Sequence, residues 1–135
     1  DSYTHDAQIV NYQGPDSEFR GREILFGSNS DGGENNQIII IDVTDKANAF
    51  KISSITYNNG GYTHQGILTE DQRFFLLGDE LDELRYGSPT KTLIFDISSL
   101  TSPTSHFNYF AEERSRNEWI NCCWIHCWQE LYPNF

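Results

Sequence analysis

The chain has 135 residues, enough to bury the core of one ordinary domain but not the cores of two domains of that size. Its 20 acidic and 9 basic residues give a formal charge of −11, which disfavours nucleic acid as a partner because no basic stripe can replace the counterions of the phosphate backbone. No apolar run reaches the roughly 18 residues that span a bilayer, so no transmembrane segment is expected.

The first half of the chain predicts four short strands, arranged around one strongly apolar run. This run, QIIIIDVTD at residues 37–45, has four consecutive isoleucines closed by turn residues, which is typical of a strand buried on both faces and followed by a turn. Polar stretches rich in Gly, Pro and Asn separate it from its neighbours. The predicted strands are Ala7–Tyr12, Arg22–Ser28, Gln37–Val43 and Phe50–Tyr57.

The second half repeats this pattern after the turn sequence NNGG at residues 58–61. Corresponding residues recur at a period in the fifties, since His64 lies 59 residues after His5 and Asp96 lies 54 residues after Asp42. The sequence therefore predicts a repeat of one four-stranded unit. The strands predicted for the second unit are Thr63–Thr69, Phe74–Glu80, Thr92–Ser98 and Ser105–Phe110.

Repeated units of four short strands are typical of β-propeller blades, whose faces are buried only by stacking on neighbouring blades. We therefore predict an all-β partial propeller over residues 1–111, with one antiparallel blade at about 4–57 and another at about 63–110. A single β-sandwich of eight strands is the alternative, because its turn signals also recur about every 8–12 residues.

The last part of the chain, residues 112–135, differs in composition and contains all three tryptophans and all three cysteines. Ser115 and Glu118 have the spacing of a capping box, and Pro133 is a suitable helix stop. We predict an amphipathic helix of about four turns in this tail. Its apolar face would carry Trp119, Ile120, Cys123, Trp124, Cys127, Trp128 and Leu131.

Four stretches in order, between residues 4 and 103, carry a family resemblance. They are THDAQIVNYQGPDSEFRGREI, IIIIDVTDKANAF, GGYTHQGILTEDQRFFLLGDELDE and TLIFDISSLTSP. Together they resemble the choice-of-anchor B proteins, whose LVIVD repeats look like propeller blades. The resemblance implies a secreted or cell-surface protein from a family without an established enzymatic activity.

This chain departs from that family in two ways. Family members are similar to one another over several further blades, whereas only two units occur here, and the tail at 112–135 has no counterpart. A propeller ring needs at least about four blades. The sequence thus leaves three alternatives open. The chain is a fragment whose blade edges are covered by the Trp-rich helix, or copies associate through open blade edges or that helix, or the chain is a truncated gene product without activity of its own.

One histidine heads the first strand of each predicted unit, His5 in THDAQ and His64 in THQG. In a propeller this strand lies nearest the axis, so equivalent histidines would gather around the central channel. Imidazoles gathered in this way can bind a metal or titrate near neutral pH. Alternatively, each histidine bonds a neighbouring backbone group and fixes the start of its strand. We predict a ligand-binding site at His5, Asp6, His64 and Gln65.

The sequence LGDELDEL predicts the candidate metal site, because hard cations prefer several carboxylate oxygens on a flexible loop. Calcium is the expected ion, and its candidate ligands are Asp79, Glu80, Asp82 and Glu83. The spacing does not match an EF-hand, and Arg85 is close enough to neutralise part of the charge, so a solvated acidic loop is the alternative. Asp31 and Glu34 have similar residue types without the EF-hand spacing.

The tail also contains ligand types that zinc prefers, but four ligands on one helix cannot surround a tetrahedral ion. These residues are Cys122, Cys123, His126 and Cys127. For catalysis, the sequence contains no G-x-S-x-G elbow, P-loop or G-x-G-x-x-G motif.

We therefore predict a non-catalytic surface module that binds a protein or a small molecule, with calcium as its only candidate cofactor. An enzyme is the less expected class. The rival hypothesis is a metal-assisted hydrolase that uses His5, His64 and the carboxylates of residues 79–83.

Overall fold

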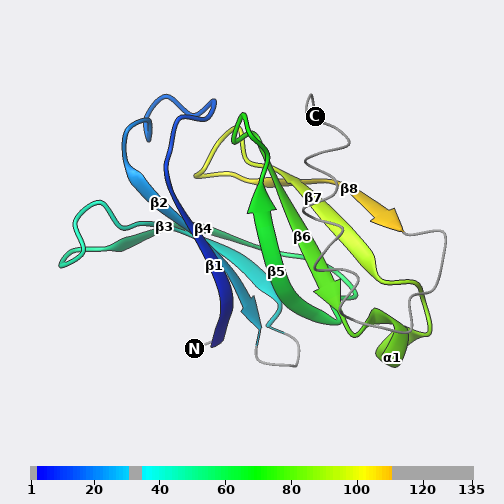
Figure 1. The fold of residues 1–135 in the computed structure, drawn as a ribbon. Helices are drawn as coiled ribbons and strands as arrows, with labels where there is room; N and C mark the ends of the chain where they lie inside the picture. Colours follow the sequence, from blue (N-terminus) through cyan, green and yellow to red (C-terminus); the bar gives the residue numbers. More distant parts are fainter. Residues whose placement is uncertain (1–2, 31–34, 111–135) are drawn as a thin grey trace.

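The computed structural model describes residues 3–30 and 35–110, which form two four-stranded antiparallel sheets (Figure 1). In each sheet every strand pairs with the next one along the chain. The N-terminal sheet consists of β1 (Tyr3–Asn11), β2 (Glu23–Ser30), β3 (Gln37–Asp42) and β4 (Phe50–Thr56). The C-terminal sheet consists of β5 (Tyr62–Leu68), β6 (Phe74–Glu80), β7 (Lys91–Asp96) and β8 (Thr104–Phe110). The prediction of an all-β chain with two four-stranded antiparallel sheets is confirmed.

One short helix, α1 (Asp82–Tyr86), lies between β6 and β7, where the sequence predicted only an acidic loop. It follows Leu81, whose φ is 71°, and ends at Gly87, whose φ of 64° is readily adopted by glycine. No helix in the described ranges is long and apolar enough to cross a membrane. The helix predicted for the tail lies outside the described residues.

The isoleucine run alternates in burial, so the prediction of a strand buried on both faces was wrong. Ile38 and Ile40 are 1% and 0% exposed, whereas Ile39 and Ile41 are only partly buried. The physical reason is that one face of the N-terminal sheet packs against the other sheet and the opposite face does not. Successive side chains of a strand point to opposite faces, so this arrangement buries every second isoleucine.

The two sheets share the same strand register and the same irregularities. An extra residue interrupts the pairing of the first two strands in both sheets, at His5 in β1 and at His64 in β5. A second extra residue interrupts the pairing of the last two strands in both, at Ile52 in β4 and at His106 in β8. Such extra residues are β-bulges, which bend a strand at a defined position. Most paired residues of one sheet therefore have a counterpart at the same register position in the other.

The turns that follow β3 and β7 are also built alike. The Asp42 carboxylate accepts a hydrogen bond from the Thr44 backbone N–H at 2.9 Å, and Asp96 accepts one from Ser98 at 2.8 Å. An aspartate that bonds the backbone two residues later holds the chain in a tight turn. The sequences DVT and DIS therefore close the two strands by the same local mechanism.

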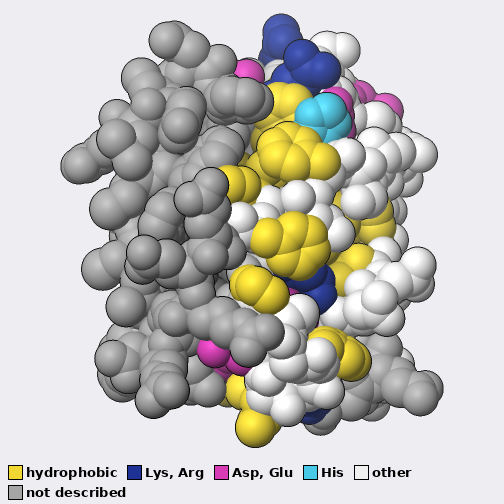
Figure 2. Space-filling view, turned by 90° about the vertical axis from the view of Figure 1, so that its right-hand side faces the viewer, with side chains coloured by type: hydrophobic (Ala, Val, Ile, Leu, Met, Phe, Trp, Pro, Cys, Tyr) yellow, Lys and Arg dark blue, Asp and Glu magenta, His cyan; other side chains and the backbone are white. Residues whose placement is uncertain are grey.

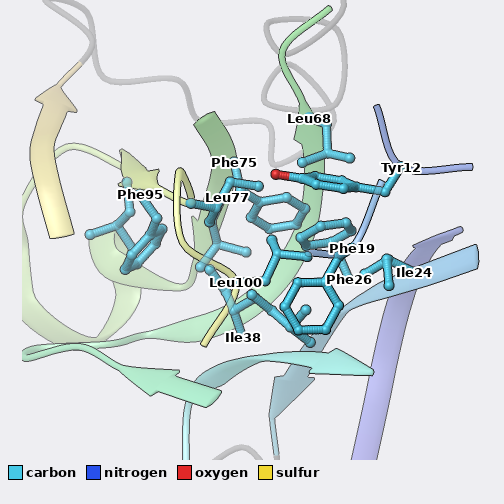
Figure 3. Close-up of a cluster of buried hydrophobic side chains, with 13 residues drawn as sticks. Tyr12, Phe19, Ile24, Phe26, Ile38, Leu68, Phe75, Leu77, Phe95 and Leu100 are labelled. Atoms are coloured by element: carbon cyan, nitrogen blue, oxygen red, sulfur yellow. The ribbon is translucent and has the colours of Figure 1, made fainter. Parts of the chain in front are cut away.

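The hydrophobic core lies between the two sheets (Figure 3). At its centre the rings of Phe26 and Phe75 stack with their centroids 5.8 Å apart. A hydrogen bond joins the sheets as well, since the Leu68 N–H donates to Gln8 Oε1 at 2.8 Å. The Ser53 hydroxyl in β4 donates to the carbonyl of Leu100, in the connection between β7 and β8, at 2.5 Å. The buried side chains are Ile24, Phe26, Ile38 and Ile40 from the N-terminal sheet, Leu68, Phe75, Leu77, Leu93 and Phe95 from the C-terminal sheet, and Tyr12, Phe19, Ile97 and Leu100 from connecting segments.

The two sheets pack through faces that are not counterparts of each other. By register, the counterpart of Phe26 is Leu76, and Leu76 points away from the N-terminal sheet because its neighbours Phe75 and Leu77 point toward it. The inner face of one sheet thus corresponds to the outer face of the other.

Candidate functional site

The two bulge histidines lie beside each other where β1 of the N-terminal sheet meets β5 of the C-terminal sheet. Their ring centroids are 4.6 Å apart, and the ring planes are inclined by 44°. His5 Nδ1 lies 2.9 Å from the backbone oxygen of His64. Because a carbonyl oxygen can only accept, Nδ1 of His5 carries the hydrogen and donates it. A neutral His5 therefore presents its Nε2 atom as a hydrogen-bond acceptor.

Two tyrosines and a carboxylate surround this pair. The Tyr62 ring meets the His5 ring edge-on at a centroid distance of 5.3 Å, and the Tyr3 ring lies 6.3 Å from it. His64 Nδ1 lies 3.4 Å from Glu80 Oε2, and these two side chains are 25% and 24% exposed. We call Tyr3, His5, Tyr62, His64 and Glu80 the histidine site. Tyr3 is 64% exposed, so the site is open to solvent on this side.

The other two predicted ligand-binding residues follow the bulges directly. Asp6 pairs with Ser28 in β2, and Gln65 pairs with Gly78 in β6. Both side chains are half-buried. The structure thus brings His5 and His64 together, and it places Asp6 and Gln65 next to them along the chain at counterpart positions in the two sheets.

Two carboxylates of the acidic sequence, one at the end of β6 and one at the start of α1, form a buried ion network rather than part of a solvated loop. Asp79 and Asp82 are both fully buried, and the Lys91 ammonium lies 3.0 Å from Asp79 Oδ2 and 2.9 Å from Asp82 Oδ1. Lys91 also donates its backbone N–H to Asp82 at 3.2 Å. We call Asp79, Asp82 and Lys91 the lysine triad. Burial of charge is costly unless the charges are paired and hydrogen-bonded, as they are here.

The lysine triad fixes the start of β5 and so positions the histidine site. Asp79 accepts hydrogen bonds from the backbone N–H groups of Gly61 at 3.1 Å and Tyr62 at 2.6 Å. Lys91 donates to the Asn59 carbonyl at 2.5 Å. A Cβ atom on Gly61 would lie 2.3 Å from the Glu80 carbonyl oxygen, so this close approach requires glycine.

Burial sets the protonation of the triad. It raises the pKa of Asp79 to about 6, although a hydrogen bond from Tyr62 and the charge of Lys91 act in the opposite direction. Burial also raises the pKa of Asp82, which the bond from Lys91 counteracts. For Lys91, burial alone would lower the pKa, but the bonds to the two aspartates raise it overall, so the ammonium stays charged.

This arrangement bears on the predicted calcium ligands. Lys91 already occupies the space between Asp79 and Asp82, and Glu80 lies beside His64. Within residues 3–30 and 35–110, no group of three or more His, Cys, Asp or Glu side chains is arranged to hold a metal ion. Calcium binding by Asp79, Glu80, Asp82 and Glu83 therefore stays a prediction. The remaining predicted ligands, Asp31, Glu34, Cys122, Cys123, His126 and Cys127, lie outside the described residues.

Three residues of these sites were missed in the sequence. Lys91 is the important one, because Arg85 was expected to neutralise the acidic sequence instead. The available signal was a lysine at the start of the apolar run KTLIFD, where an unpaired charge would be costly. Tyr3 and Tyr62 were detectable as aromatic residues two positions before each histidine.

No protein-family model matches the chain, and none of the curated proteins compared with it is significantly similar.

Proposed function

We propose that this chain is a non-catalytic β-propeller module, and that its histidine site binds a cationic hydrogen-bond donor, such as the side chain of lysine or arginine. The observation that carries the proposal is that the inner face of one sheet corresponds by register to the outer face of the other. In this arrangement the two sheets stack head-to-tail, and His5 of β1 lies beside His64 of β5.

The packing of non-counterpart faces supports blades over a sandwich of two related sheets. If two copies of one sheet were related by a two-fold axis, each would bury the same face. Here the N-terminal sheet buries the face that contains Phe26, and the C-terminal sheet buries the face opposite to the counterpart residue Leu76. Head-to-tail stacking of this kind generates rings when the rotation closes, as in propellers.

The chemistry of the histidine site favours a ligand that donates hydrogen bonds and carries positive charge. His5 uses Nδ1 to bond the His64 carbonyl, which leaves Nε2 as an acceptor when the ring is neutral. The Glu80 carboxylate lies on the same site, and the faces of Tyr3 and Tyr62 can contact a cation. The formal charge of −11 would attract such a ligand at long range.

The resemblance to choice-of-anchor B proteins supports a location at the cell surface or outside the cell, and a role in binding rather than catalysis. The metal-assisted hydrolase gains no support from the geometry, because Asp79 and Asp82 bond Lys91 instead of facing the two histidines as free ligands.

The experiment is a titration with Nα-acetyl-lysine amide, monitored by NMR of the histidine side chains. The control ligand is Nα-acetyl-norleucine amide, which has the same chain length without the ammonium group. We expect the lysine compound alone to shift His5 and His64 resonances, and to be recovered unchanged.

Two variants locate the binding. His5→Ala should abolish it, and Glu80→Gln should weaken it by about two- to fivefold, the range of an exposed ion pair. His106→Ala is the matched control, since this exposed histidine lies in β8. Equal shifts with the norleucine compound, or binding that survives His5→Ala, would contradict the proposed ligand.

A further inference from the structure

Because the two sheets share one strand register, the outer face of each sheet corresponds to the buried face of the other. We infer that the outer face of the N-terminal sheet and the outer face of the C-terminal sheet are complementary to each other, and that a second copy of this chain docks head-to-tail through them. This inference rests on the proposed stacking of blades and not on the histidine site.

The outer face of the N-terminal sheet repeats the surface that the C-terminal sheet buries. By register, its apolar residues correspond one by one to core residues of the C-terminal sheet. A Cβ atom built on Gly27 would lie 3.0 Å from Ile39 and 3.3 Å from Leu25, so these side chains share this face. The four residues are Ile9, Leu25, Ile39 and Ile41, and their buried counterparts are Leu68, Phe75, Leu93 and Phe95.

The outer face of the C-terminal sheet in turn repeats the surface that the N-terminal sheet buries. Its residues Phe74, Leu76 and Ile94 correspond to Ile24, Phe26 and Ile40 in the core, and Phe107 corresponds to Ser53. Ser53 faces the C-terminal half, since its hydroxyl donates a hydrogen bond to the carbonyl of Leu100 in the β7–β8 connection. Hydrophobic side chains form a column on the side of the molecule where β8 lies (Figure 2).

Each outer face is exposed only in part: Leu76 and Ile94, on the outer face of the C-terminal sheet, are each 5% exposed, and the open residues are Ile9 on one face and Phe107 on the other. Ile9 is 55% exposed and Phe107 is 38% exposed, whereas Leu68, the counterpart of Ile9, is only 3% exposed. Contact with a second copy would bury Ile9 as the internal interface buries Leu68. Burial of such apolar area is the main favourable contribution to association.

A second copy is the occupant to which the geometry points, because each copy carries both halves of the contact. Such an interface leaves one unmatched face at each end, so addition continues until a ring closes. Propellers have about four to eight blades, so copies with two sheets each would close as rings of about two to four copies.

The test measures the mass of the full-length chain by light scattering after gel filtration, over a range of concentrations. The buffer should have an ionic strength of about 0.15 M, where the Debye length of about 8 Å screens repulsion between chains of the same charge. We expect a closed assembly of about two to four copies.

Two single-face variants make the test specific to this interface. Ile9→Lys blocks only the outer face of the N-terminal sheet, and Phe107→Lys blocks only that of the C-terminal sheet. Each variant alone should be monomeric, with affinity reduced at least about tenfold. An equimolar mixture should form a dimer of one copy of each and nothing larger, because one intact pair of faces remains. Both positions are exposed in the single copy, and circular dichroism verifies that each variant folds.

Leu84→Lys is the control, since Leu84 lies on α1, is 79% exposed and belongs to neither face. It should assemble like the parent chain. A parent chain that stays monomeric at all concentrations would overturn the inference. So would an assembly that persists in either single-face variant, or a mixture that fails to form the mixed dimer. Loss of lysine binding by the histidine site with assembly intact would overturn the proposed ligand and leave this inference standing.

Discussion

Replacement of Lys91 by methionine tests whether the lysine triad holds the start of β5. The change keeps most of the side-chain volume but leaves Asp79 and Asp82 buried without their cation. At an effective dielectric constant of about 20, unit charges 3.0 Å apart attract by about 5–6 kcal/mol, and part of this is offset by the cost of desolvation. Removal of one partner of such a buried ion pair lowers the free energy of unfolding by about 3–5 kcal/mol. We expect Lys91→Met to lower the free energy of unfolding at pH 7 by this amount.

The assay is urea denaturation followed by circular dichroism, for the parent chain and the variant at pH 7 and pH 5. The cost should be smaller at pH 5, because the uncompensated carboxylates can then be protonated, and Asp79 has a pKa of about 6 even with Lys91 present. Lys46→Met is the matched control, since Lys46 pairs with Glu23 at the surface and is 68% exposed. Such a pair contributes only about 0–1 kcal/mol. If Lys91→Met costs no more than Lys46→Met, or if its cost does not depend on pH, the triad does not hold the start of β5 by charge pairing.

Other perturbations address the titration and the packing. The raised pKa of Asp79 means that the folded chain binds this proton more tightly than the unfolded chain, so its contribution to stability is present below about pH 4 and is lost as pH rises through about 6. The free energy of unfolding should therefore decline between about pH 4 and pH 6, and Asp79→Asn should flatten this part of the profile; an identical slope in the variant would refute the assignment. For Asp42, burial raises the pKa, but hydrogen bonds from Arg22 and Thr44 outweigh it and lower the pKa overall, so its stabilisation is present above about pH 4 and is lost in acid. Asp42→Asn should reduce the further loss of stability below about pH 4 in the same denaturation series. Gly66→Ala should lower the free energy of unfolding by about 1–3 kcal/mol, because the new Cβ would lie 2.2 Å from the Phe75 ring. The counterpart change Ala7→Gly lies on the outer face and should cost less than about 1 kcal/mol in the same assay; equal costs would contradict the assignment of the two faces.

The strand pattern was largely predictable because it depends on local information. The period-2 alternation of Phe50–Thr56 and the turn sequence at residues 58–61 needed no distant contact to be recognised. The same is true of the aspartates after β3 and β7, whose side chains bond the backbone two residues away. The recurrence of His5 as His64 also indicated that the two halves fold alike.

The contacts within the candidate site were less predictable, because they join residues that are far apart in the chain. The sequence LGDELDEL looked like a solvated loop or a calcium site, and nothing local indicates that Lys91 enters between Asp79 and Asp82. The short helix α1 was missed for a related reason. Five residues are too few for a periodic signal, and Gly87 alone marks its end.

The sequence by itself determined eight strands, their order in two repeated meanders and the turns that close them, because alternating hydrophobicity and turn chemistry act over a few residues. Only the tertiary structure decided which face of each sheet is buried, that Phe26 meets Phe75, and that His5 contacts His64. These features depend on how one sheet is rotated onto the other, and that rotation is selected by the packing of whole apolar faces rather than by any single segment.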